Sequence, residues 1–90
     1  MNLPREPGPG VLTREFEPDR VAEAVVYAVA EAADADPLSI EPIYDSVDPD
    51  ALTALVRSGA DDLVVSFSHH GVPIDVYADG TVVAVTGTVD

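Results

Sequence analysis

The hydrophobic period of this chain changes once, near Leu63, and that change limits the fold to helices followed by strands. Before Leu63, apolar residues such as Val21, Val25 and Val29 recur at the spacing of one helix face. After it, apolar and polar residues alternate, as they do in half-buried strands. The sequence therefore predicts an α+β fold in which two helices pack on one face of a three-stranded antiparallel β-meander (α-α-β-β-β).

The two predicted helices have recognisable ends. The first is expected from Pro18 to about Ala33, because proline suits a first helical turn. The second begins at Asp48, whose side chain is a good N-cap, and Pro49 takes the first helical position. Gly59 is expected to end it, because glycine readily takes the left-handed conformation at a helix C-terminus.

Two segments lie outside these helices and the strands. Residues 1–17 are rich in proline and glycine and are predicted to be a flexible leader, which leaves residues 18–87 as a single domain. Residues 38–47 join the helices and are too apolar for a free loop. They are expected to lie over the core, either as a helical turn or as a short extended piece.

Three short strands follow, joined by two recognisable turns. Gly71 marks the first turn, and Asp79 with Gly80 is a strong hairpin signal for the second. Across the first turn, Phe67 is expected to lie opposite Ile74. The strands are predicted at residues 63–68, 73–78 and 81–86.

The register of the second hairpin follows from its turn. If Ala78 pairs with Thr81, then Val76 lies opposite Val83 on the core face. Hydrogen-bonding groups alternate sides along a middle strand, and Val72 and Ala78, which would flank the two turns, have the same parity, so ideal two-residue turns cannot stand at both ends of this strand. The longer loop is expected in the first hairpin, over residues 69–72.

The other face of the predicted sheet carries one apolar row, Val64, Tyr77 and Val82. Two helices cover only one face of so small a sheet, so this row is either exposed to solvent or a contact surface. Tyrosine buries a large area at low entropy cost, which makes Tyr77 a candidate anchor for a partner or a symmetric dimer. Tyr44 is a second candidate. The alternative for Tyr77 is a half-buried strand tyrosine.

The charge balance is strongly acidic. The chain has four basic residues, all arginine, against 17 Asp and Glu, which gives a formal net charge of −13. At about 1 M salt the Debye length is about 3 Å, so most of the resulting repulsion is screened. The composition therefore fits a protein that works in molar salt, as in the cytoplasm of a salt-accumulating halophile.

Composition also excludes several classes of protein. Cysteine is absent, which excludes disulfide scaffolds and thiolate chemistry. No apolar run reaches the roughly 18 residues of a membrane span, and the N-terminus lacks the apolar stretch of a signal peptide. A cytoplasmic location without membrane contact is therefore expected. The arginines are scattered and form no basic stripe, which disfavours nucleic-acid binding.

Two groups of side chains resemble metal ligands. His69 and His70 would need a third ligand such as Asp75, and adjacent residues of a hairpin usually face opposite ways, so they are interpreted as loop histidines without a function. The carboxylates between Asp45 and Asp50 are spaced like calcium ligands, but the run lacks the glycine and the terminal glutamate of an EF-hand loop. Capping by Asp48 explains them more simply. No catalytic, cofactor-binding or metal-binding residue is assigned.

Two stretches of the chain carry a family resemblance. They are VAEAVVYAVAEAADADPLSIEPIYDSVDPDALTALV and VSFSHHGVPIDVYADGTVVAV, and the segment DSVDPDAL is the most specific part. In order and spacing they resemble the halobacterial output domain, a small haloarchaeal module, over roughly residues 20–86. This resemblance implies a role in output or protein interaction, both in stand-alone chains and in domains attached to receiver modules. It supplies no catalytic residues.

The expected function is a non-enzymatic interaction or output module in haloarchaeal signal transduction or regulation, without a cofactor. Its expected partners are receiver or kinase components, or a second copy bound through the open sheet face or an edge strand. The alternative is an accessory transcription regulator that contacts nucleic acid alone or in complex. That alternative requires Arg14, Arg20 and Arg57 on one face, and binding that weakens as salt is added.

Overall fold

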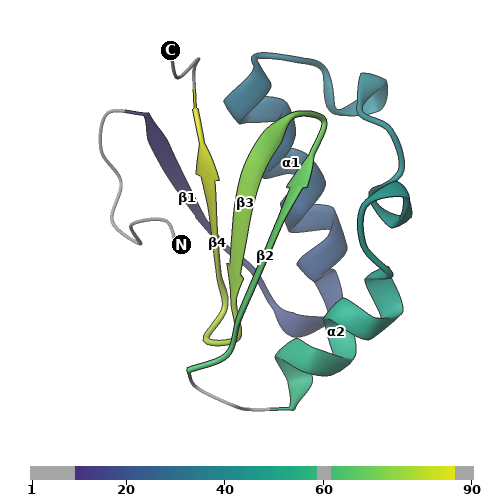
Figure 1. Cartoon of the computed structure of the whole chain (residues 1–90), viewed down its shortest axis with the longest axis vertical. Helices are drawn as coiled ribbons and strands as arrows, with labels where there is room; N and C mark the ends of the chain where they lie inside the picture. Colours follow the sequence, from purple (N-terminus) through teal and green to yellow (C-terminus); the bar gives the residue numbers. More distant parts are fainter. Residues whose placement is uncertain (1–9, 59–61, 87–90) are drawn as a thin grey trace.

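The fold is a four-stranded antiparallel sheet with both helices on one of its faces (Figure 1). The computed structural model describes residues 10–58 and 62–86. Across the sheet the strands run in the order β1-β4-β3-β2. The α+β class and the placement of the helices agree with the prediction. The elements are β1 (Val11–Glu15), α1 (Val21–Ala33), α2 (Pro49–Arg57), β2 (Val64–His69), β3 (Val72–Tyr77) and β4 (Thr81–Val85).

The sheet has one more strand than predicted. Residues 11–15, predicted to belong to a flexible leader, form β1 and pair with β4, with Val11 opposite Val85 and Leu12 opposite Ala84. The prolines that suggested a leader all precede Gly10, whereas Leu12 and Phe16 pack against the hydrophobic core. Pairing with β1 also satisfies the backbone groups that β4 would otherwise leave open at the edge of the sheet.

Helix α1 ends close to the predicted position. It follows a 3-10 turn at Pro18–Arg20 and stops where Asp34 takes the left-handed conformation (φ 55°, ψ 47°). The backbone N–H of Ala35 then donates to the carbonyl of Ala30 at 2.8 Å, which closes the helix C-terminus. Small side chains let the helix approach the sheet closely. Its buried residues are Val21, Ala24, Val25, Ala28, Val29 and Ala30.

The connection between the helices consists mainly of helical turns, one of the two conformations that its sequence left open. It contains two 3-10 turns, Pro37–Ser39 and Ile43–Asp45. Ile43 is buried in the core, and Leu38 is 95% exposed. The connection therefore lies over the core, with Ile43 buried and Ile40 and Val47 packed against it, and only Leu38 among these residues faces solvent fully.

The sequence Asp48-Pro49-Asp50 forms the start of α2. The Asp48 carboxylate accepts hydrogen bonds from the backbone N–H groups of Asp50 (2.9 Å) and Ala51 (3.3 Å), and Pro49 occupies the first turn. Leu52 and Val56 are buried on the inner side of the helix. Gly59, expected to end the helix, lies outside the described residues.

The first hairpin has the predicted strand pairing but a shorter turn. Phe67 lies opposite Ile74, as predicted, and the last pair before the turn is His69 with Val72. Only His70 and Gly71 connect the strands, so the expected loop over residues 69–72 is wrong. Both turn residues have positive φ, 54° and 75°, and two-residue turns of this kind match the twist of the paired strands.

The second hairpin carries the longer connection. Tyr77 pairs with Thr81 across three residues, 78–80, and Gly80 has φ 108°. Val76 therefore lies opposite Val82, and the predicted pairing with Val83 is wrong by one residue. Because successive side chains point to opposite faces, this shift turns Val82 toward the helices and Val83 to the other face.

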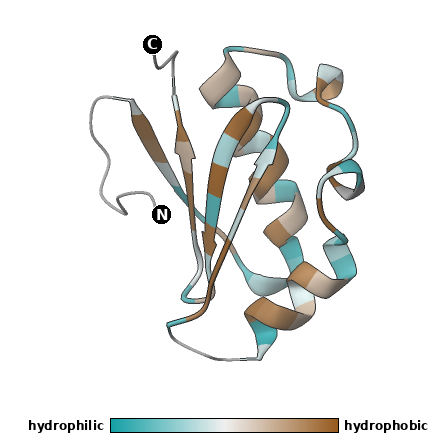
Figure 2. Cartoon of the chain, viewed as in Figure 1, coloured by the Kyte–Doolittle hydropathy of each residue, from teal (hydrophilic) through white to brown (hydrophobic). Residues whose placement is uncertain are grey.

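Figure 2 shows hydrophobic positions along the strands and in both helices. The side chains of these residues form one core between the sheet and the helices. Most of them are valine or alanine, in keeping with a composition that lacks tryptophan. Leu52 and Ile74 are among the largest fully buried side chains. The strand residues of this core are Val72, Ile74, Val76, Val82 and Ala84, with Leu12, Val65 and Phe67 partly buried against them.

Replacing Asp48 by alanine should destabilise the protein by about 1 kcal/mol, because two backbone donors of α2 lose their acceptor. The matched control is Asp50→Ala, which removes the same charge from the first turn but no capping side chain. Chemical denaturation in molar KCl measures both. Equal losses in the two variants would show that charge, and not capping, accounts for the effect.

Candidate functional site

The sheet face opposite the helices is called the helix-free face here, and it is less open than the sequence predicts. Tyr77 lies on it but is only 9% exposed, and its neighbour Val83 is fully buried. Val82, predicted beside Tyr77, instead lies on the helix side and is fully buried. Val64 is the one member of the predicted row that is both on this face and partly exposed.

Tyr44, the other candidate anchor, belongs to the 3-10 turn Ile43–Asp45. Its side chain lies outside what the structure describes. The proposed row of Val64, Tyr77 and Val82 is therefore not a continuous exposed surface, because the hairpin register separates Val82 from the other two.

A buried carboxylate also lies on the helix-free face. Asp75 is 2% exposed and accepts a hydrogen bond from the Ser66 hydroxyl at 2.6 Å. Ser66 belongs to β2 and Asp75 to the opposite position of β3. A charged group is buried at high cost unless it is hydrogen-bonded, so this pair contributes to the cohesion of the two strands.

His69 links β2 to the connection between the helices. It is the last residue of β2 and is 1% exposed, so the interpretation of it as a loop histidine is wrong. Its ring contacts the carbonyl of Glu41 through Nε2 (2.8 Å) and the hydroxyl of Ser46 through Nδ1 (2.6 Å). A carbonyl can only accept, so Nε2 carries a proton, and in the neutral ring Nδ1 accepts from the Ser46 hydroxyl.

Ser46 and His69 thus have the contact of a nucleophile with its base, but their surroundings differ from those of an acyl-transfer site. The backbone N–H groups of Ser46 and Val47 both donate to the carbonyl of Ile43, at 2.9 and 3.0 Å. They are therefore committed within the turn and do not converge on a point where an oxyanion could sit. The pair acts as a structural connection.

His70 points to a different partner from His69. Its Nδ1 lies 2.5 Å from the carboxylate of Glu41, and both side chains are partly exposed. Two contacts lower the pKa of Glu41 below its usual value of 4.5. The larger effect comes from a hydrogen bond with its own backbone, and the smaller one comes from the contact with His70. Among residues 10–58 and 62–86, no three His, Cys, Asp or Glu side chains gather as metal ligands.

The described arginines each face a carboxylate. Arg14 pairs with Glu31 at 3.4 Å and stacks over Tyr27, with 5.3 Å between the guanidinium carbon and the ring centre. Arg20 pairs with Glu23 at 3.3 Å. Arg14 and Arg20 line one groove of about 440 Å³, which three glutamates also line.

Arg57 pairs with Asp19 next to an adjoining groove of about 420 Å³, and Glu17 lines both grooves. These arginines are therefore balanced by acidic side chains, and the described part of the surface shows no unneutralised basic stripe for a phosphate backbone.

Sequence reasoning expected contact through an edge strand but did not identify which strand, and in the structure β2 has an open outer edge. The N–H of Ala78 donates to the carbonyl of Leu63 (3.0 Å), which identifies 63, 65, 67 and 69 as the residues that bond to β3. The backbone groups of Val64, Ser66 and Ser68 consequently point away from the sheet. Among the described residues, none donates to or accepts from them.

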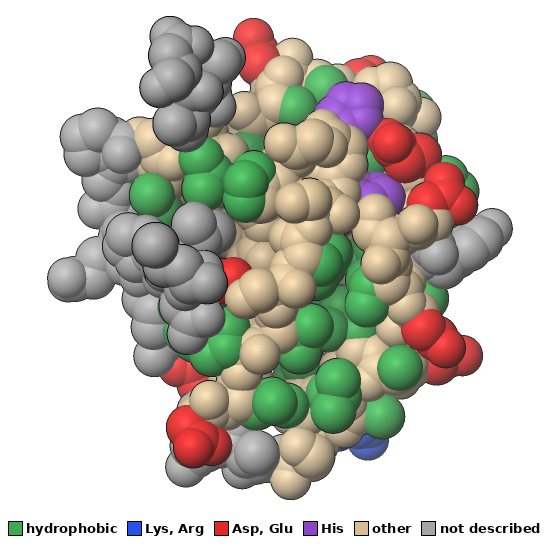
Figure 3. Space-filling view, in the orientation of Figure 1, with side chains coloured by type: hydrophobic (Ala, Val, Ile, Leu, Met, Phe, Trp, Pro, Cys, Tyr) green, Lys and Arg blue, Asp and Glu red, His purple; other side chains and the backbone are tan. Residues whose placement is uncertain are grey.

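This edge also lacks the usual protection against pairing. Natural edge strands carry charges, proline or a bulge, and β1 at the other edge carries Arg14 and Glu15. From Leu63 to Ser68 the chain has no charged residue and no proline, and the β2–β3 register is continuous. In Figure 3, most carboxylates lie near the rim of the view, and the atoms in its middle, where Figure 1 shows β2, are uncharged. The uncharged run was visible in the sequence, but its edge position was not.

His69→Ala should destabilise the protein by about 2 kcal/mol, because a buried ring is lost and its partners keep unmade hydrogen bonds. The neighbouring His70→Ala is the matched control and should cost at most about 0.5 kcal/mol, because that side chain is partly exposed. Denaturant unfolding at neutral pH in molar KCl compares the two. Similar losses would contradict the structural role of His69.

The pH dependence of stability should change in Glu41→Gln. The folded state lowers the pKa of Glu41, so its contacts contribute stability above pH 4.5 that is lost as pH falls through the lower, folded value. The variant should lose less stability than the parent as the pH falls below 4.5, and His70→Ala should show part of that effect. Urea midpoints measured against pH in molar KCl test this. Parallel profiles for parent and Glu41→Gln would refute it.

No curated protein and no solved structure matches the chain. None of the helices in the described ranges has the length and apolar character to cross a membrane. The family model for halobacterial output domain 1 matches residues 17–86, which include both helices and β2 to β4. The chain therefore belongs to the halobacterial output domain 1 family.

Proposed function

We propose that this chain is a non-enzymatic output module that acts by protein contact in haloarchaeal signal transduction or regulation. Family membership supports the output role. The observation that carries the proposal is the outer edge of β2, where Val64, Ser66 and Ser68 present backbone donors and acceptors beside uncharged side chains. Such an edge pairs readily with a strand of another chain.

The edge strand replaces the helix-free face as the proposed contact surface. Tyr77 and Val83 are already buried on that face and have little area left to contribute to a partner. Ser66 and Ser68, in contrast, are exposed on β2. Strand addition draws its affinity from main-chain hydrogen bonds, so it does not require a large apolar patch.

The proposed partners are receiver or kinase components of two-component signalling, in the cytoplasm of a cell with molar salt. Contact through uncharged backbone groups suits that medium, because screening at about 1 M salt weakens charge-based recognition but not strand pairing. The accessory nucleic-acid role remains the alternative, and no observation on the described arginines favours it.

Affinity purification of the tagged chain in about 1 M KCl tests this proposal, since charge is largely screened there. The informative variant is Ser68→Pro, which removes an outward N–H without touching the bonds between β2 and β3; Ser68→Ala is its matched control. A receiver- or kinase-containing protein should be recovered by the parent and Ser68→Ala and lost from Ser68→Pro.

Three results would contradict the proposal. A partner retained equally by Ser68→Pro would show that β2 is not the contact surface. Recovery of nucleic acid that nuclease removes would favour the regulator instead. Recovery of nothing beyond the tag control would contradict an output role by stable protein contact.

A further inference from the structure

We propose that the outer edge of β2 binds β2 of a second copy of this chain, antiparallel and centred on Ser66, so that one continuous sheet runs through the dimer. The inference rests on the proposed function in one respect, namely that β2 is the contact surface. It adds a second copy of the chain as an occupant of this edge, where it competes with a strand of a receiver or kinase component, and it adds the register. Four properties of the strand lead to it.

The first property is the phase of the backbone. Val64, Ser66 and Ser68 carry the outward N–H and C=O groups. In an antiparallel pair related by a twofold axis, outward residues must face outward residues. Centring the pair on Ser66 places Val64 opposite Ser68 of the second copy, and all three residues find partners. A shift of the centre to Val65 or Phe67 leaves one of them beyond the end of the opposing strand.

The second property is side-chain match. In this register Phe67 lies opposite Val65 of the second copy on the helix side of the sheet, and the reverse pair forms by symmetry. Both residues pack against the core but remain partly exposed in the single chain. Aromatic and β-branched side chains form favourable cross-strand pairs, so the dimer covers apolar area that one chain leaves in water.

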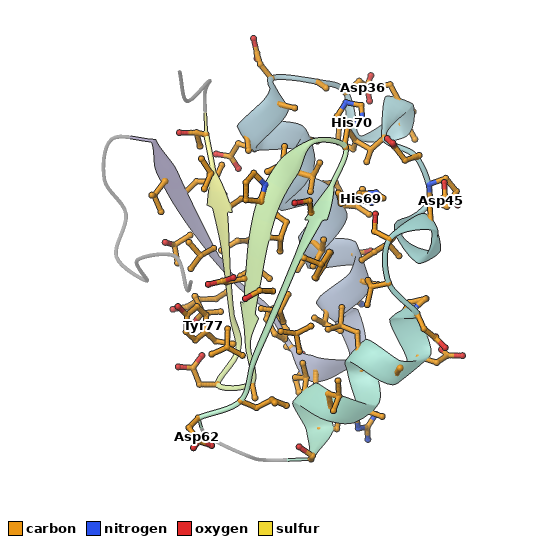
Figure 4. The ribbon with its side chains drawn as sticks, viewed as in Figure 1. Asp36, Asp45, Asp62, His69, His70 and Tyr77 are labelled. Carbon is orange, nitrogen blue, oxygen red and sulfur yellow. The ribbon has the colours of Figure 1, made fainter. Side chains whose placement is uncertain are left out.

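The third property is the pair of residues that flank the strand. Figure 4 shows Asp62 and His70 at opposite ends of β2. The register centred on Ser66 therefore places Asp62 of one copy opposite His70 of the other. Asp62 then meets an imidazole that Glu41 of its own chain already contacts, and the strand residues between the two ends carry no charge. A chain with a net charge of −13 has few segments that can meet their own copy without opposing carboxylates.

The fourth property is the absence of edge protection within a strongly charged chain. The other edge strand carries Arg14 and Glu15, whereas β2 has no charge between Leu63 and Ser68. Two acidic copies repel each other at low salt, and screening removes most of that repulsion at about 1 M salt. Dimerisation should therefore strengthen with added salt, which is opposite to the salt dependence of nucleic-acid binding.

A single introduced thiol tests the register, because the native chain has no cysteine. In the proposed dimer, Ser66 of the two copies face each other with Cβ atoms about 5 Å apart. Ser66→Cys should therefore be cross-linked by a short bismaleimide in molar KCl. Ser58→Cys, exposed at the end of α2, is the matched control and should not be cross-linked. Equal cross-linking of both variants would overturn the register.

A second substitution in the Ser66→Cys variant tests whether the cross-link depends on the outward backbone N–H of Ser68. Adding Ser68→Pro to Ser66→Cys should abolish the cross-link, and adding Ser68→Ala should preserve it. Circular dichroism checks that each variant is folded. If Ser68→Pro is unfolded, the comparison of Ser66→Cys with Ser58→Cys decides the matter alone. A cross-link that persists in a folded Ser68→Pro variant would overturn pairing through the edge.

Light scattering of the parent separates this inference from the proposed function. A dimeric mass in molar KCl that falls toward a monomer at low salt supports the inference. A monomer at every salt concentration overturns it, and if Ser68→Pro still abolishes capture of a receiver or kinase protein, the output role stands with a different occupant of the edge. A dimer that captures no such protein supports the inference and contradicts the output proposal.

Discussion

The arrangement of this sheet depends on β3, which is hydrogen-bonded to β2 on one side and to β4 on the other. Its backbone groups alternate between the two neighbours, so Val72 bonds to β2 beside the two-residue turn at His70-Gly71, and Tyr77, of opposite parity, bonds to β4. The connection from Tyr77 to β4 has three residues, 78–80. This length turns Val82 and Ala84 toward the helices.

The charge of the chain and the small size of its core side chains act together. Ion pairs such as Arg14–Glu31 and Arg20–Glu23 are exposed, and pairs of this kind contribute little stability in water and less in salt. Stability therefore depends on the close packing of valine and alanine between α1 and the sheet, and on screening of the net charge. At about 1 M salt most of the repulsion between these charges would be screened.

His69 joins the sheet to the helical layer. Through Ser46 and the carbonyl of Glu41 it connects the end of β2 to the segment between the helices. The end of the edge strand is thus held by the helical layer as well as by β3. A strand held in this way offers its outward groups in a fixed geometry, which would reduce the entropy lost in the proposed pairing with another strand.

Much of this protein followed from its sequence, because the signals concerned are local. Hydrophobic period predicted both helices and three strands, Asp48 and Pro49 marked the start of α2, and quoted motifs pointed to the output-domain family. Tertiary structure decided the rest. Whether residues 11–15 form a strand depends on the open edge of β4, far along the chain. The register that buries Val82 and the partners of His69 also depend on distant residues, and so does the edge position of β2. Local sequence cannot encode such contacts, because their energy arises only when both partners are in place.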